Sequence, residues 1–101
     1  MRARSRADGG KIVYAHMESI EHELLGVLNE VLRHKRRAEL AVVERGTHLR
    51  DDLHFDSLDL AELTVRIEER FGIDVFEAGV VSRYGEIESR VIQHVRSGKQ
   101  R

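Results

Sequence analysis

Apolar residues recur every three or four positions in three separate stretches of the chain. Such a spacing places them along one face of an α-helix, so each stretch predicts an amphipathic helix. The first stretch contains Ile20, Leu24, Val27, Leu28, Val31 and Leu32. Ser19 precedes this stretch and is its predicted N-cap. The last stretch contains Ile87, Val91, Ile92 and Val95, with Glu86 and Glu88 in its first turn and Arg96 near its end.

The middle stretch, residues 57–71, carries apolar residues on two sides rather than one. Asp56 is its predicted N-cap, Asp59 completes a capping box, and Gly72 is placed to end the helix. With successive residues about 100° apart, the larger stripe consists of Leu60, Leu63, Thr64, Ile67 and Phe71. We expect this larger stripe to enter the core. The second stripe consists of Leu58, Ala61 and Val65 and is expected to be exposed, either as scattered surface hydrophobes or as a partner site.

Less regular segments separate the predicted helices. Residues 38–55 indicate a long loop with three spaced anchors, which are Leu49, Leu53 and Phe55. Residues 77–82, with Val80 and Val81, predict a single helical turn, and Tyr84-Gly85 predicts a break before the last helix. The chain is therefore expected to be all-α: a small four-helix bundle with a long first loop and a short third helix.

A length of 101 residues fits one compact domain. We expect a flexible N-terminal arm at residues 1–16, a helical domain at 17–97 and a flexible tail at 98–101. The absence of Cys excludes disulfides and thiolate metal sites. No apolar run is long enough to span a bilayer, so a cytoplasmic protein without stable membrane insertion is expected.

The charge pattern disfavours nucleic-acid binding. The formal net charge is −1, so no global field attracts nucleic acid or a membrane. A helix-turn-helix DNA binder is disfavoured because the middle helix carries Asp59, Glu62, Glu68 and Glu69, which would repel phosphates. The basic run at residues 33–37 has two interpretations: cations at the negative end of a helix dipole, or an anion-binding patch.

Few residues suggest catalysis. The chain has no phosphate loop, no HExxH and no GxSxG motif, and its His residues lack metal-ligand spacing. His48 and His54 flank the loop before Ser57, but no third residue or oxyanion hole completes a hydrolase site. Ser57 instead begins a helix, where backbone N–H groups and the dipole favour negative charge, so an attached phosphodiester would be tolerated. The alternative is that Ser57 is a simple capping residue.

The segment DSLDLAEL, residues 56–63, closely resembles the DSL motif of acyl carrier proteins. The segment IEERFGI, residues 67–73, is similar to the end of the same helix and the turn after it, and the likeness extends over residues from about 18 to 96. The resemblance implies that a phosphopantetheinyl transferase attaches 4'-phosphopantetheine from coenzyme A to Ser57. It also implies that Asp56 contacts the transferase or its metal ion, with no resident metal in the carrier.

The resemblance further implies a substrate carrier rather than an enzyme, monomeric, with intermediates held as thioesters on the cofactor. Its partners would be the transferase and acyl-activating, acyltransferase or synthase enzymes. The implied partner-facing positions are Leu58, Asp59, Ala61, Glu62, Val65 and Glu69.

Several positions depart from the family pattern. His54 stands where relatives usually have glycine, Phe76 stands where proline is common, and Arg66 and Arg70 interrupt the acidic helix. With a nearly neutral chain, these departures favour a specialised lipid or polyketide pathway over the main fatty-acid pathway. The alternatives are an aminoacyl carrier, or an interaction adaptor that has the carrier fold without a prosthetic group.

Overall fold

The computed structural model describes residues 9–77, 79 and 81–98, and it describes side chains from residue 19 onward. These described residues contain three helices, α1 (Gly9–His34), α2 (Ser57–Phe71) and α3 (Tyr84–Arg96). No strand occurs in the described residues; His48 and Arg83 form one isolated antiparallel bridge. The expected all-α class is therefore confirmed.

Helix α1 begins earlier than the sequence indicated. It starts at Gly9, so Ser19 lies inside the helix and the prediction that Ser19 is an N-cap is wrong. The backbone of residues 9–16, expected to belong to a flexible arm, is helical because adding a residue to an existing helix is much easier than nucleating one. Residues 1–8 and 99–101 lie outside the described part of the chain, and the division into arm, domain and tail stays a prediction.

Helix α2 has the predicted limits and caps. The Asp56 Oδ1 atom accepts a hydrogen bond from the Asp59 N–H at 2.9 Å, and Asp59 Oδ2 accepts one from the Asp56 N–H at 2.8 Å. Gly72 has the left-handed φ of 75° that ends a helix at low cost for glycine, and its N–H donates to the Glu68 carbonyl at 2.8 Å. The capping box and the C-terminal glycine are both confirmed.

Helix α3 begins at Tyr84, so the expected break at Tyr84-Gly85 is wrong. The Glu86 carboxylate accepts the Arg83 N–H at 3.0 Å and thereby satisfies a donor at the start of the helix. Gly85 is required by close packing rather than by a turn. Its N–H donates to the Arg45 carbonyl oxygen at 2.9 Å, and a Cβ at this position would lie 2.9 Å from that oxygen.

The short helix expected at residues 77–82 is not confirmed. Of its described residues, Glu77 lies in a turn, Gly79 in a bend, and Val81 and Ser82 in irregular structure; the other two residues lie outside the described part of the chain. The Asp74 carboxylate accepts the Phe76 N–H at 3.0 Å, which closes a turn in competition with a helix. The Arg90 guanidinium of α3 donates to the Val75 carbonyl and fastens this segment to the last helix.

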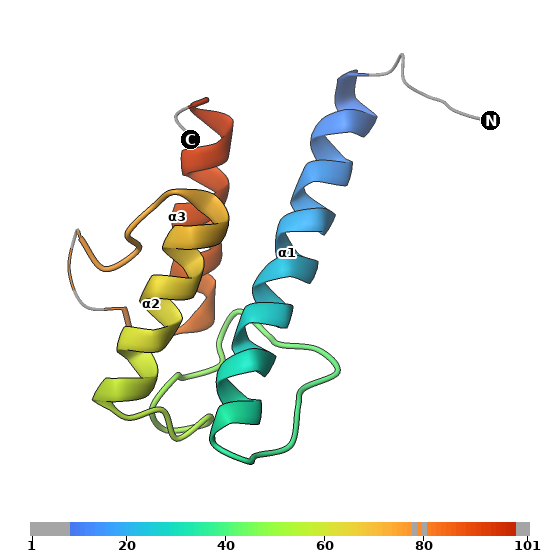
Figure 1. Cartoon of the computed structure of the whole chain (residues 1–101). Coiled ribbons are helices and arrows are strands. Elements are labelled where there is room, and N and C mark those ends of the chain that lie inside the picture. Colours follow the sequence, from blue (N-terminus) through green and yellow to red (C-terminus); the bar gives the residue numbers. More distant parts are fainter. Residues whose placement is uncertain (1–8, 78, 80, 99–101) are drawn as a thin grey trace.

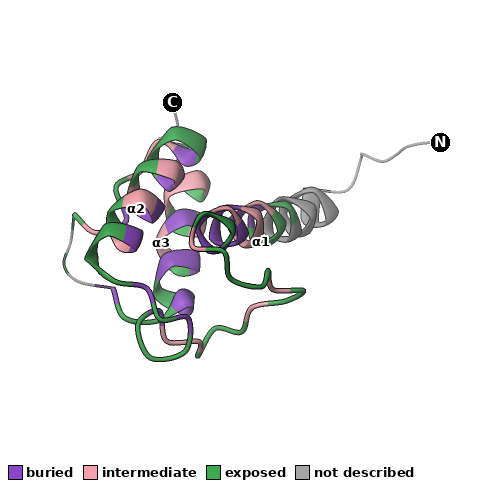
Figure 2. Ribbon diagram, turned by 60° about the horizontal axis from the view of Figure 1, so that its bottom comes forward, coloured by how far each residue is buried: buried purple, intermediate pink, exposed green. Residues whose placement is uncertain are grey.

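The core lies where α1 packs against both α2 and α3 (Figure 1). Figure 2 shows that the buried faces of the three helices turn toward one another. Buried apolar residues of the helices are Ile20, Leu24, Val27, Leu28, Val31, Leu32, Leu63, Ile67, Phe71, Tyr84, Ile87 and Val91. The apolar periodicity therefore identified the core face of each helix.

The long loop between α1 and α2 crosses the lower end of the bundle in Figure 1. Its predicted anchors Leu49, Leu53 and Phe55 are all buried, which confirms their assignment. A polar contact fastens the other end of the loop. The Asn29 side chain of α1 donates to the Leu40 carbonyl at 3.0 Å and accepts the Leu40 N–H at 2.7 Å. The loop is thus held to the bundle at both ends and delivers the chain to the start of α2.

Candidate functional site

Ser57 is the first residue of α2 and is exposed. The capping box between Asp56 and Asp59 fixes the backbone conformation at the start of the helix, immediately before Ser57. The N-terminal end of the helix also carries the positive end of the helix dipole. A phosphodiester on this hydroxyl would point into solvent beside backbone N–H groups. The local geometry therefore fits an attached phosphate without rearrangement of the core.

Asp56 supplies a carboxylate next to Ser57 and is itself exposed. The hydrogen bond from the Asp59 backbone N–H lowers the pKa of the Asp56 carboxyl below its usual value. Asp56 is therefore ionised at neutral pH, which suits contact with a metal ion carried by an incoming phosphate donor.

Asp59 occupies a different environment from the one expected. It is 8% exposed, and its carboxylate lies 2.6 Å from the Lys35 ammonium. The expectation that Asp59 faces partners is corrected here. Its carboxylate caps the helix through the Asp56 N–H and pairs with Lys35, so it lies inward and stabilises the start of α2.

The two stripes of α2 lie as predicted. Leu58 is 80% exposed and Val65 is 51% exposed, and Ala61 between them is also exposed. We call these three residues the apolar strip. Leu63 and Ile67, from the larger stripe, are fully buried. The apolar strip therefore begins next to Ser57 and follows the outward side of α2.

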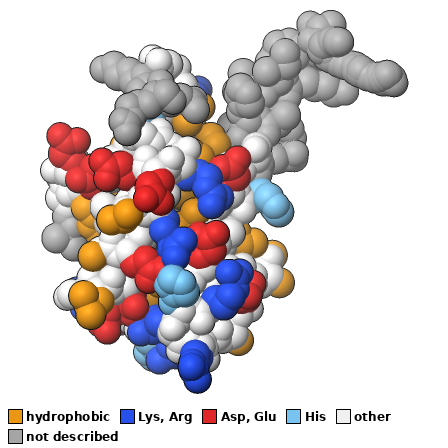
Figure 3. Space-filling model, in the orientation of Figure 1, with side chains coloured by type: hydrophobic (Ala, Val, Ile, Leu, Met, Phe, Trp, Pro, Cys, Tyr) orange, Lys and Arg blue, Asp and Glu red, His pale blue; other side chains and the backbone are white. Residues whose placement is uncertain are grey.

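The charged residues beside the strip are paired across the two helices. Glu62 Oε2 lies 2.8 Å from Arg66 Nε and 2.8 Å from His34 Nδ1. Arg66 Nη1 also lies 2.8 Å from Glu30 Oε1 of α1. Figure 3 shows acidic and basic side chains alternating along the face where α1 and α2 meet. Glu69, the last expected partner residue, is exposed near the C-terminal end of α2.

Part of this arrangement was readable in the sequence. Glu62 and Arg66 are four positions apart, which is a spacing for ion pairs on a helix. Their pairing with His34 and Glu30 required knowledge of how α1 and α2 cross, and sequence reasoning missed it.

The basic run at residues 33–37 spans the last turn of α1 and the turn after it, and three of its side chains form ion pairs. Arg33 contacts Glu39 at 2.9 Å, His34 contacts Glu62, and Lys35 contacts Asp59. Arg33 and His34 occupy the last turn of α1, where the dipole interpretation placed them. The ion pairs of Arg33, His34 and Lys35 connect the end of α1 and the turn after it to the long loop and to α2. Because these three side chains already contact carboxylates, they do not form an anion-binding patch.

The structure gives no support to a Ser–His hydrolase. The His48 Nδ1 atom accepts the Asp51 N–H at 3.1 Å, so this imidazole is directed at its own loop. Within the described residues, no group of three or more His, Asp or Glu side chains could hold a metal ion. None of the described helices is long and apolar enough to cross a membrane.

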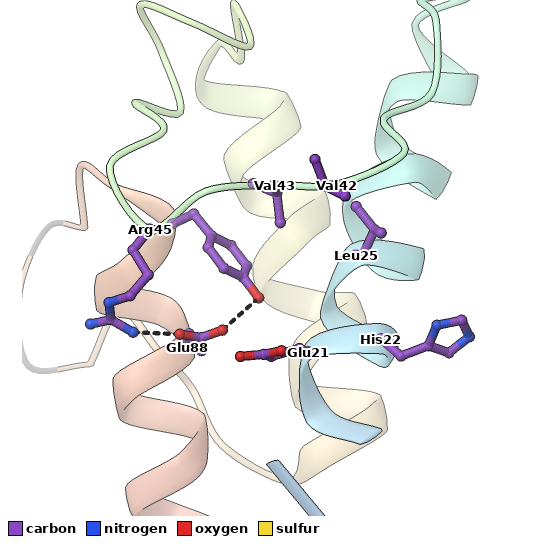
Figure 4. Close-up of a pocket in the computed structure, with 8 residues that line it drawn as sticks. Glu21, His22, Leu25, Val42, Val43, Arg45 and Glu88 are labelled. Atoms are coloured by element: carbon purple, nitrogen blue, oxygen red, sulfur yellow. Dashed lines mark hydrogen bonds and ion pairs between the residues drawn. The ribbon is translucent and has the colours of Figure 1, made fainter. Parts of the chain in front are cut away.

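A cavity of about 360 Å³ lies between α1, the long loop and α3. Figure 4 shows Leu25, Val42 and Val43 along one part of its wall and Arg45 with Glu88 along another. Glu88 is buried, pairs with Arg45 and accepts the Tyr84 hydroxyl hydrogen at 3.2 Å. Burial beside Glu88 raises the pKa of Tyr84. These contacts fasten the loop to α3 and account for the polar side of the cavity.

Comparison with known proteins identifies the family of this chain. Residues 22–81 match the family model described as phosphopantetheine attachment site. A curated relative named acyl carrier protein, from Rubrobacter xylanophilus, is 31% identical over 74 residues, which cover 71% of this chain and 91% of that protein. No solved structure matches the chain. The family match spans more than half of the chain, and the chain therefore belongs to the acyl carrier protein family: it is a carrier rather than an enzyme, and its cofactor is covalent 4'-phosphopantetheine.

Proposed function

We propose that Ser57 carries the 4'-phosphopantetheine group and that the chain holds acyl intermediates as thioesters on it. The observation that carries this proposal is an exposed hydroxyl at the first position of a capped helix. The ionised Asp56 beside it and the apolar strip that follows support the same assignment. When bound, the cofactor supplies the thiol that forms the thioester.

The residues of this chain act by positioning. Asp59 and Lys35 fix the first turn of α2, so that Ser57 is presented at its exposed end. Leu58, Ala61 and Val65 offer apolar contact to the transferase and to acyl-handling enzymes, and Glu69 extends that face with a carboxylate. We propose that the protein works as a monomer in the cytoplasm.

The proposed pathway is a specialised one, for a lipid or a polyketide. A net charge of −1, and the pairing of Arg66 and Arg70 with α1 carboxylates, give a face that is much less acidic than a run of free glutamates would be. An aminoacyl thioester is the alternative cargo. The adaptor without a prosthetic group is disfavoured, because the family match is to a phosphopantetheine attachment site.

Intact mass tests the attachment site. The protein is incubated with coenzyme A, magnesium and a promiscuous phosphopantetheinyl transferase, and we expect the mass of one phosphopantetheine to be added. Ser57→Ala should prevent the addition, whereas Ser82→Ala, which alters an exposed serine shortly before α3, should not. Addition to the Ser57→Ala protein would refute the site, and an unmodified wild type would favour the adaptor.

A further inference from the structure

Six charged or titratable side chains form ion pairs along the surface where α1 and α2 meet. We call this set the interhelical ladder, and its members are Glu23, Glu30, His34, Glu62, Arg66 and Arg70. Arg66 is its centre because it reaches carboxylates on both helices at 2.8 Å. Arg70 lies one turn further along α2, and its contacts are longer, at 3.7 Å to Glu30 and 4.0 Å to Glu23.

The ladder neutralises Glu62 within the molecule. The same oxygen, Oε2, contacts both Arg66 Nε and His34 Nδ1. The hydrogen bond to Glu62 also raises the pKa of Arg66, so the guanidinium keeps its charge. A cation on a partner would have to compete with a bond that is already made, in a place where the side chains of Glu62 and Arg66 are only 27% exposed.

With Glu62 engaged, the surface that follows Ser57 has little free charge. The apolar strip presents Leu58 and Val65 to solvent. Glu69, like Glu68 before it, is exposed and has no ion pair among the described residues, but it lies 12 positions after Ser57. At a rise of 1.5 Å per residue it is about 18 Å away along the helix axis. The exposed side chains in the first turns of α2 after Ser57 are therefore mainly apolar, and the exposed carboxylate next to Ser57 is that of the N-cap, Asp56.

We infer that Arg66 masks Glu62 and so determines partner specificity: the chain fits enzymes whose contact surface near Ser57 is apolar and weakly charged, rather than basic. This inference rests on the proposed function, because it specifies the partners of the same site. It makes Arg66 a specificity-determining residue. Affinity for such partners comes from burial of the apolar strip, which salt does not screen, and electrostatic steering contributes little.

Two matched variants test the masking. Arg66→Gln and Arg70→Gln remove the same charge from the same helix one turn apart, but only Arg66 touches Glu62. Both are made in the Ser57→Ala protein, and binding is measured to an immobilised transferase that has a basic docking surface. We expect Arg66→Gln to bind roughly two- to fivefold more tightly at low salt, the size of effect given by one exposed charge. Arg70→Gln should leave the affinity unchanged.

The gain should disappear at roughly 0.5 M salt, because salt screens interactions between surface charges. It should also disappear when Glu62→Gln is added to Arg66→Gln. Equal gains in the two single variants would show an effect of net charge and overturn the inference. An unchanged affinity in Arg66→Gln, with circular dichroism showing a folded protein, would overturn it as well. If Arg66→Gln does not fold, Glu62→Gln alone decides: a masked carboxylate predicts no loss of binding, and a loss refutes the masking.

The design separates this inference from the attachment site. Binding is measured on chains that cannot be modified at residue 57. If the variants bind as expected but the transferase does not modify Ser57 in the wild-type protein, the attachment site is refuted and the masking is not. Modification of Ser57 together with lower affinity in Glu62→Gln would refute the masking alone.

Discussion

Lys35 Nζ lies 2.6 Å from Asp59 Oδ2, and this contact joins the turn after α1 to the first turn of α2. The two side chains are only 20% and 11% exposed, so the pair is shielded from solvent. The same Asp59 oxygen accepts the Asp56 N–H. One carboxylate thus fixes both the start of α2 and its position relative to α1, immediately beside Ser57.

Removal of this carboxylate should destabilise the protein. Asp59→Ala deletes half of the capping box and leaves Lys35 without its partner, for an expected loss of about 1–3 kcal/mol in the free energy of unfolding. Urea denaturation measures the loss. Glu69→Ala, which removes an exposed carboxylate from the same helix, should stay within about 0.5 kcal/mol of wild type. Equal losses in both variants would contradict a structural role for the Lys35–Asp59 contact.

The face assignment of α2 predicts opposite results for two neighbouring substitutions. Ile67 is 0% exposed, so Ile67→Asp places an unpaired charge in the core and should unfold the domain. Val65→Asp alters the exposed apolar strip, so the fold should survive while the transferase modifies the protein more slowly. Circular dichroism and the rate of mass addition are the two measurements. Unfolding by Val65→Asp with survival of Ile67→Asp would reverse the two faces.

Acid should weaken the start of α2 through Asp56. The pKa of this carboxyl is lowered in the folded state, chiefly by the hydrogen bond from the Asp59 N–H. A lowered folded-state pKa gives stability that is complete above the ordinary pKa, about 4, and that is lost as the pH falls through the lower folded value. Asp56→Asn keeps a good N-cap but does not titrate. Its free energy of unfolding should therefore fall less steeply than that of wild type below about pH 4.

The test is a series of urea denaturations from neutral pH into acid. Glu86 also has a lowered pKa, from hydrogen bonds with the Arg83 and Ser82 N–H groups, and it titrates in both proteins. The comparison therefore isolates Asp56. Parallel curves for wild type and Asp56→Asn would mean that this carboxyl contributes no acid dependence.

His54 stands in the left-handed region of the backbone, with φ of 59°. A side chain in this conformation costs roughly 1–2 kcal/mol that glycine does not pay. Glycine loses part of this advantage because the unfolded chain gains freedom. We therefore expect His54→Gly to stabilise the protein by up to about 1 kcal/mol, and the β-branched His54→Val to destabilise it. Thermal unfolding of both variants tests this, and a less stable His54→Gly would show that the imidazole makes a compensating contact.

The sequence by itself determined the helical period, the core face of each helix and the caps of α2. These features depend on spacings of three and four residues and on side chains that act on their own backbone, as Asp56 and Gly72 do. They need no knowledge of the rest of the fold. The exposure of Leu58 and Val65 followed for the same reason, since the opposite side of the helix had the larger stripe to bury.

Features set by contacts between distant segments were decided only by the tertiary structure. Gly85 is needed in the first turn of α3 because the Arg45 carbonyl approaches its backbone, and Asp59 lies inward because Lys35 reaches it from the turn after α1. The sequence likewise indicated that Glu62 is a free carboxylate, whereas the structure shows that His34 of α1 contacts it. The physical reason is common to all three. Local spacing determines the direction in which a side chain leaves its own helix. Which residue it contacts, and therefore whether its charge is available to another protein, depends on how distant segments of the chain pack together.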